Sequence, residues 1–278
     1  MAERFDFTLD PVEADVLGQA LGAPARIFPF RFRTTTGDPR RLAALAGQVD
    51  AGLARRRLSV RGRLNNQVRT AFALFAEHRV LVAIAGIDGL GATIAVAGLT
   101  DGAQALGITQ LAADDRLEFS LFSDDEFVDV LAGVLPPVDG APGGPVAVER
   151  RADAEMSAMR RRRLAEAEHD DEETRAFDTI EVGPRLGPGG HELPEPEADE
   201  PAGLLAGTRF GGGQIEVTGR DRAGRRVAAA TLGWVDTAVG RYLVHADAGP
   251  GGAVSARFVP AGREGVADAI GRAVAHVY

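Results

Sequence analysis

The side chains best suited to chemistry are spread along the chain without the spacing that catalysis or metal binding requires. The histidines are His78, His169, His191, His245 and His276. None of them forms an HxxxH or HxH pair, the patterns that bring two imidazoles to one metal ion. The serines all lie outside a G-x-S-x-G turn, which would expose a nucleophilic hydroxyl. Because the chain has no cysteine, thiol nucleophiles, thiolate ligands and disulfides are excluded.

Three further stretches could serve chemistry, and each has a simpler interpretation. Glycines at 211–213 precede a predicted strand, and those between 86 and 91 lie between two strands, whereas a phosphate-binding loop follows a strand and opens a helix. The run 169–173, HDDEE, offers oxygen ligands to a hard cation, but ligands that are consecutive favour a solvated charge run. The sequence therefore predicts no catalytic, cofactor-binding or metal-binding residue, and a protein that is not an enzyme.

The charge of the chain is concentrated in one segment. The formal net charge is -9, and all 31 basic residues are arginine. Residues 165–200 hold 13 Asp and Glu against two Arg. No basic stripe with interleaved aromatic residues is visible, so we expect no nucleic-acid partner.

The N-terminal residues and one apolar run bear on membrane insertion. No apolar signal-peptide region opens the chain. Residues 80–99 form a 20-residue apolar run, but Asp88-Gly89 at its middle is typical of a hairpin turn between two strands. These features predict a cytoplasmic protein that is not inserted in a membrane.

Three consecutive strands are predicted in residues 209–245. From Gln214 to Arg220 the side chains alternate, with Ile215 and Val217 on one face. The turn 221–224 leads into a second strand at 225–234, and the turn 236–240 leads into a third at 241–245. The free face of the first strand carries Gln214, Glu216, Thr218 and Arg220.

The motifs of these strands resemble a known family. GGGQ at 211–214, GRDRAGR at 219–225, the Trp-x-Asp-Thr turn at 234–237 and GRYLV at 240–244 are similar to the C-terminal half of the EspG family, secretion-associated proteins of type VII (ESX) systems in actinobacteria. The resemblance covers both ends of the chain outside 149–201. It implies a central, mainly antiparallel sheet flanked by helical bundles. It also implies a cytosolic chaperone or adaptor that holds PE/PPE heterodimers by the tip of the PPE helical bundle and keeps them soluble for export; another helical-hairpin pair is the alternative cargo.

The first half is predicted to mix helices and strands. Helices are expected after Asp10, Asp38 and Asn65, with Asp10 and Glu13 forming a capping box. Residues 26–32 are expected to be extended, the hairpin 80–99 is followed by strands at 104–112 and 116–122, and Ser123 to Glu126 form a capping box for a helix at 126–135.

The same order of elements recurs in 213–277, which predicts a duplicated unit. We expect a single α+β domain over 1–278 with a pseudo-twofold axis, in which the halves 1–148 and 202–278 join edge to edge in one sheet. Residues 149–201 are interpreted as an inserted charged linker, with a helix near 151–169 and a mobile acidic part at 170–200.

The sequence alone leaves the role of the free face open. As a partner surface it would comprise Gln214, Glu216, Thr218, Arg220, Trp234, Arg241 and Tyr242. A solvated sheet face, with Trp234 and Tyr242 packed in the core, is the other interpretation. Two other functions are considered, a small-molecule enzyme with a pocket between sheet and helices, and a regulatory scaffold that uses the acidic linker. The expected oligomeric state is a monomer or weak homodimer.

Overall fold

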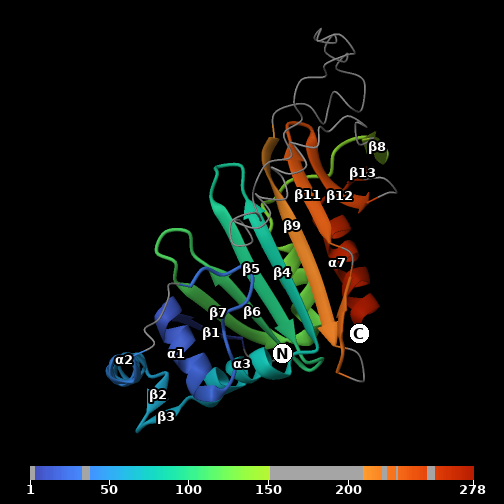
Figure 1. The fold of residues 1–278 in the computed structure, drawn as a ribbon. Coiled ribbons are helices and arrows are strands. Elements are labelled where there is room, and N and C mark those ends of the chain that lie inside the picture. The colour runs from blue at the N-terminus through green and yellow to red at the C-terminus, as the bar shows by residue number, and fades with distance from the viewer. Residues whose placement is uncertain (1–3, 33–37, 151–208, 221–223, 230, 249–253) are drawn as a thin grey trace, which may run out of the picture.

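One large antiparallel sheet organises the molecule. The computed structural model describes residues 4–32, 38–150, 209–220, 224–229, 231–248 and 254–278. The strands follow the order β1-β7-β6-β5-β4-β9-β11-β12-β13-β8, and β10 also pairs with β9 (Figure 1). The strands of this sheet are β1 (Phe5–Leu9), β4 (Val80–Ile87), β5 (Thr93–Thr100), β6 (Gln104–Gln110), β7 (Leu117–Ser123), β8 (Val146–Arg150), β9 (Arg209–Arg220), β10 (Arg226–Ala228), β11 (Leu232–Thr237), β12 (Gly240–Ala248) and β13 (Val254–Pro260).

Helices pack on both faces of the sheet. In the earlier half α1, α2 and α3 lie on one face, which we call the α1–α3 face (Figure 1). The opposite face, the α4/α7 face, is covered by α4 and by the last helix. A two-stranded hairpin, β2 (Ser59–Val60) and β3 (Arg63–Leu64), follows α2. The helices among the described residues are α1 (Pro11–Leu21), α2 (Pro39–Arg55), α3 (Asn66–Glu77), the short 3-10 helix η1 (Asp124–Glu126), α4 (Phe127–Ala132) and α7 (Arg263–Val277).

The strand order is symmetrical about the central pair β4 and β9. On one side β4, β5, β6 and β7 are followed by α4, and on the other β9, β11, β12 and β13 are followed by α7. The first strand of each half, β1 or β8, pairs at the outer edge. This symmetrical order confirms the predicted pseudo-twofold α+β arrangement. Pairing of β4 with β9 removes one exposed edge from each half.

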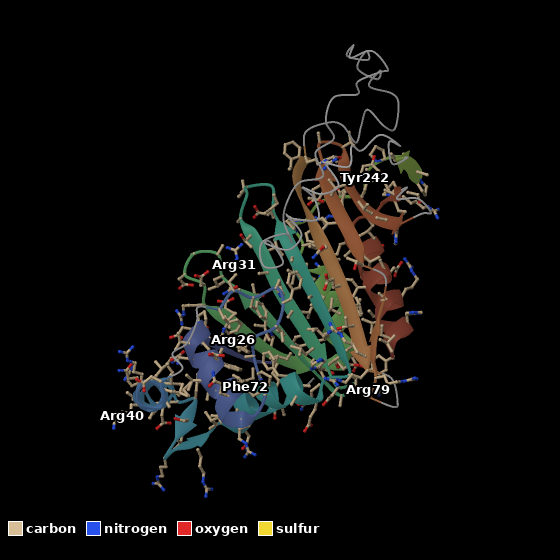
Figure 2. The ribbon with its side chains drawn as sticks, viewed as in Figure 1. Arg26, Arg31, Arg40, Phe72, Arg79 and Tyr242 are labelled. Carbon is tan, nitrogen blue, oxygen red and sulfur yellow. The ribbon has the colours of Figure 1, made fainter. Side chains whose placement is uncertain are left out.

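Apolar side chains fill both sides of the sheet. Phe72 of α3 stacks on Phe119 of β7, with ring centroids 6.1 Å apart, in the cluster beneath α1 to α3 (Figure 2). On the α4/α7 face, Ile84 and Ile215 pack beneath the helices with Ile270. Full burial of each such side chain contributes about 1.5–3 kcal/mol to the stability of the fold.

The starts of the first helices follow the sequence. The carboxylate of Asp10 accepts a hydrogen bond from the amide of Glu13 at 2.8 Å, and the Glu13 carboxylate accepts one from the Asp10 amide at 3.0 Å. The side chain of Asn65 likewise accepts from the amide of Gln67 at 2.8 Å and begins α3. These side chains satisfy amides that lack a partner inside the helix.

Two predictions for the earlier half are wrong. Ser123 makes no capping hydrogen bond; β7 continues through it, and the carboxylate of the next residue, Asp124, accepts a hydrogen bond from the hydroxyl of Thr100. The short helices η1 and α4 replace the longer predicted helix. Residues 26–32 form no strand, and the side chain of Gln110 bonds the amide and carbonyl of Arg31 at 2.8 and 2.9 Å. The strand β1 was missed.

The predicted strand 225–234 is divided into β10 and β11. Ala228 lies opposite Thr218, and Leu232 lies opposite Ile215, so this strand has one residue more than β9 over the same stretch. Such a bulge moves the following side chains to the other face of the sheet. It places Leu232 on the α4/α7 face.

The inserted segment falls mainly outside the described residues. The predicted helix near 151–169 and the acidic part at 170–200 lie there entirely. The predicted boundary between 148 and 149 falls within β8, which pairs with β13 of the later half. In the described part of the chain no helix is long and apolar enough to cross a membrane, and the run 80–99 forms the hairpin of β4 and β5.

Candidate partner-binding face

The later half of the sheet carries a described helix on one face only. Ile215 and Val217 of β9 are buried in the cluster that includes α7. On the opposite face Gln214, Glu216 and Thr218 are half-buried, and Arg220 is exposed. The alternation agrees with the sequence pattern. Contact of these four side chains with a partner stays a prediction.

Neighbouring strands extend this face, which we call the open face, with apolar side chains. One row across the sheet runs from Gln214 through Gly233, Val244 and Phe258 to Val146. All except Gly233 and Gln214 are apolar, and Val146, Val244 and Phe258 are only partly buried. Among the described residues, no helix packs over this row. The open face is therefore less polar than β9 alone indicates.

Tyr242 lies on the same face but is enclosed. Its side chain is 2% exposed and packs against Ala141, and its ring meets that of Phe258 edge-on, with centroids 6.4 Å apart (Figure 2). This packing is the other role that the sequence left open for Tyr242. The Tyr242 ring therefore packs beneath the open face and is not itself accessible to a partner in this conformation.

Trp234 is also buried, on the α4/α7 face. A Cβ added to Gly213 would lie 2.4 Å from its ring, and one added to Gly86 would lie 2.7 Å from it. Gly213 lies between Gly86 and Trp234 in the sheet. The glycines at 211–213 therefore include one that makes room for an indole ring. The indole Nε1 is buried without a hydrogen-bond partner among the described residues.

Arg241 forms the most enclosed ion pair in the described part of the chain. Its guanidinium donates to both carboxylate oxygens of Asp236, at 2.6 and 2.9 Å, and to the carbonyl of Pro136 at 2.9 Å. Arg241 is 1% exposed and Asp236 is 3% exposed. The pair spans the turn between β11 and β12, and it holds the chain that leaves the earlier half. Arg241 thus has a structural role in this conformation.

Exposed apolar side chains gather at one end of the central strands. None of them belongs to the partner surface predicted from the sequence. They form what we call the apolar rim: Ile87, Leu90, Phe210 and Val239, exposed by 47, 95, 49 and 36%. The ends of β4 and β9 meet here, because Ile87 lies opposite Gly212, and a Cβ on Gly89 would lie 3.7 Å from Phe210. Val239 is in the turn between β11 and β12 beside them.

The turn that carries Leu90 is held rigid. The carboxylate of Asp88 accepts hydrogen bonds from the amides of Leu90 and Ala92, each at 2.8 Å. Because the backbone of this turn is already held by hydrogen bonds, a partner that contacted Leu90 would restrict the backbone little further. The signal in the sequence was an apolar residue inside the turn D-G-L-G, where polar residues are usual.

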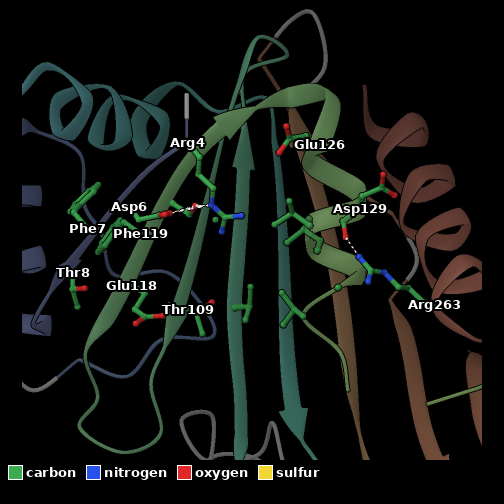
Figure 3. Close-up of a pocket in the computed structure, with 17 residues that line it drawn as sticks. Arg4, Asp6, Phe7, Thr8, Thr109, Glu118, Phe119, Glu126, Asp129 and Arg263 are labelled. Atoms are coloured by element: carbon green, nitrogen blue, oxygen red, sulfur yellow. Dashed lines mark hydrogen bonds and ion pairs between the residues drawn. The ribbon is translucent and has the colours of Figure 1, made fainter. Parts of the chain in front are cut away.

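A concave region lies on the α4/α7 face of the earlier half. It is an open groove of about 770 Å³ between α4 and strands β1, β5, β6 and β7 (Figure 3). Ser120 donates to Asp6 at 2.5 Å and accepts from Arg4 at 2.7 Å, so these three groups satisfy one another. No histidine lines the groove. Within the described ranges, no cluster of three His, Asp or Glu side chains could hold a metal ion.

Comparisons with known proteins agree with the architecture. The family model described as the EspG family matches residues 10–272. None of the curated proteins matches the chain. The fold is similar to a chain in the structure of the Mycobacterium tuberculosis type VII secretion system chaperone EspG5 in complex with a PE25–PPE41 dimer. The TM-score is 0.57 at 12% identity, and the match covers 98% of this chain and 96% of that chain.

Proposed function

Because the chain belongs to the EspG family, we propose that it is a non-enzymatic chaperone of a type VII secretion system that binds a helical secretion substrate in the cytoplasm. The substrate class is a PE/PPE-like pair, since the similar EspG5 chaperone was solved in complex with a PE25–PPE41 dimer. By analogy, binding would cover apolar surface of the substrate and keep it soluble until export.

The apolar rim is the observation that carries this proposal. Ile87, Leu90, Phe210 and Val239 come from three chain segments and are exposed together, next to the open face. Burying a leucine or a phenylalanine side chain against a partner contributes about 1.5–3 kcal/mol. Leu90 and Phe210 would therefore act as anchors for the apolar end of a helical hairpin, and the half-buried Gln214, Glu216 and Thr218 would supply polar contacts beside them.

The test is calorimetry with a helical-hairpin pair encoded at the same locus. Leu90→Asp and Phe210→Asp should each weaken binding at least about tenfold. Their midpoints of urea unfolding should stay close to that of the unmodified chain, because Leu90 is 95% exposed and Phe210 is 49% exposed.

Leu21→Asp is the matched control. Leu21 is 40% exposed and lies at the end of α1, away from the rim, so the same change in charge should leave binding intact (Figure 1). If the rim variants bound the substrate as tightly as the unmodified chain, the interface would not include the rim. A substrate pair that stays soluble alone and shows no binding would end the proposal.

A further inference from the structure

Arginines gather at the end of the molecule farthest from the later half. Residues 38–64 contain seven arginines and two carboxylates, Asp38 and Asp50. They occupy α2 and the β2–β3 hairpin, which projects beyond α1 (Figure 1). The side chains of Arg55, Arg57, Arg61 and Arg63 are exposed, as is Val60, and Val60 pairs with Arg63 across the hairpin. We call these five residues the arginine hairpin.

The guanidinium groups of the arginine hairpin take no part in the ion pairs between described residues. Its neighbour Arg56 is bound, donating to Glu13 at 2.5 Å and to the carbonyl of Thr8 at 2.6 Å. Arg41 approaches Asp38 at 3.8 Å. In the part of the chain that the structure describes, none of the four arginines of the hairpin forms an ion pair.

Two of these arginines occupy backbone positions that favour other residues. The amide of Leu58 bonds the carbonyl of Leu53 at 2.9 Å, which closes α2 with Arg57 at φ +58°, the position where glycine is usual. Arg61, at φ +52°, precedes Gly62, at φ +71°, in a two-residue hairpin turn that favours asparagine or aspartate at its first position. Arginine at either position strains the backbone, and such strain is often retained for function.

We propose that the arginine hairpin is a docking site for a carboxylate-rich peptide segment of a partner protein. Val60 and Arg63 are cross-strand neighbours beside the turn, so an apolar residue of the peptide can contact Val60 while flanking carboxylates bond Arg61 and Arg63. Guanidinium groups match carboxylates in geometry, with two parallel N–H···O bonds. This inference does not depend on the identity of the secretion substrate.

Other polyanions fit the arginine hairpin less well. Residues 38–64 contain no aromatic side chain on which a nucleic-acid base could stack. A single exposed valine offers little apolar surface for insertion into a bilayer. The net charge of -9 repels an extended anionic surface, whereas a short acidic peptide needs to meet only the hairpin.

Fluorescence anisotropy of the full-length chain with labelled decaglutamate tests the proposal, with decaglutamine as the uncharged probe. Arg61→Asn combined with Arg63→Asn should weaken binding about tenfold. The single variants Arg57→Gly and Arg61→Asn should also weaken it, while their unfolding midpoints stay equal or rise because backbone strain is relieved. Loss of binding with unimpaired folding separates this role from a structural one.

Arg272→Asn is the matched control, since Arg272 is exposed on α7 at the other end of the sheet. The proposal is overturned if decaglutamate does not bind, if Arg272→Asn weakens binding as much as the hairpin variants, or if anionic vesicles or duplex DNA bind the same arginines more tightly. If amide replacement of Asp170, Asp171, Glu172 and Glu173 strengthened peptide binding tenfold, this chain's own acidic segment would be the occupant instead of a partner.

Discussion

The earlier and later halves of the sheet share a topology but differ in how their faces are covered. In the earlier half, Val96 and Leu99 of β5 point to opposite faces and both are buried, beneath α4 and beneath α1–α3. In the later half, Ile215 of β9 is buried on the face that α7 covers. Its neighbours Gln214 and Glu216 point to the other face of the sheet and are half-buried. Among the described residues, helices therefore cover both faces of the earlier copy of the unit but only one face of the later copy.

The two halves meet along β4 and β9, and small residues make that contact close. Gly86 of the earlier half and Gly213 of the later half lie opposite each other beneath the ring of Trp234. The indole thus covers the boundary between the halves. If the halves act as one body, disturbing this boundary should cost far more than disturbing an exposed helix.

Gly213→Val is expected to have the largest effect. An added Cβ would lie 2.2 Å from the carbonyl oxygen of Ala85 and 2.4 Å from the Trp234 ring, and the backbone oxygen has no room to move within the ladder. We expect a loss of at least about 3 kcal/mol in the free energy of unfolding, measured by urea denaturation.

Gly47→Ala is the control for this substitution. In α2 an added Cβ meets nothing within 4 Å, so replacing this helical glycine should raise stability by about 0.5–1 kcal/mol. A small loss for Gly213→Val would show that the boundary can separate and that the halves are not one packed body.

Arg241→Met tests an enclosed ion pair of the later half. It would leave the Asp236 carboxylate buried without its cation, and we expect a loss of about 3–5 kcal/mol. Adding Asp236→Leu should recover most of that loss, since a buried pair can be replaced by apolar groups.

The ion pair of Arg41 and Asp38 in the earlier half is the counterpart. Its atoms are 3.8 Å apart and both side chains are largely exposed, so Arg41→Ala should change stability by less than about 0.5 kcal/mol. Chemical denaturation of the two variants in parallel gives the comparison. Equal losses would mean that enclosure of the pair has no influence on its contribution.

The sequence could predict elements whose pattern is local. The capping box of Asp10 and Glu13, the Asp88-Gly89 turn and the alternation in β9 depend on neighbouring residues, and the repeated order of elements gave the pseudo-twofold sheet. The Ser123 cap does not form, and the neighbouring Asp124 instead accepts a hydrogen bond from Thr100, a residue distant in sequence. A local motif does not show such a long-range contact.

The candidate site was harder to predict than the fold. The pattern placed Gln214 and Glu216 away from the core, but it gave no sign that the bulge before Leu232 would turn Trp234 toward α7. The buried guanidinium of Arg241 donates to the carbonyl of Pro136, which lies 105 positions away in the sequence. Leu90 and Phe210 are exposed together only because β4 and β9 pair. These facts depend on register between distant strands, which residue types alone leave undetermined.

The smallest effect should come from His78, which lies where α3 meets β4. Burial lowers the pKa of its imidazole below the ordinary value of 6.5, and the charges of Arg220 and Arg226 in the later half lower it further, although its Nδ1 donates to the carbonyls of Leu74 and Phe75. The unfolded chain therefore binds a proton more readily than the folded one. Stability from this group is fully present above that ordinary pKa and falls as the pH decreases through and below it.

His78→Gln should remove this part of the pH dependence. Unfolding free energies of the two proteins, measured by urea denaturation from about pH 8 to about pH 5, should run parallel above the ordinary histidine pKa and converge below it. Arg220→Gln should weaken the effect without abolishing it, because burial is the larger cause of the lowered pKa. If Arg220→Gln left the NMR titration of His78 unchanged, the charge of Arg220 would have no measurable effect on the pKa of His78. The two halves would then be electrostatically independent where they join.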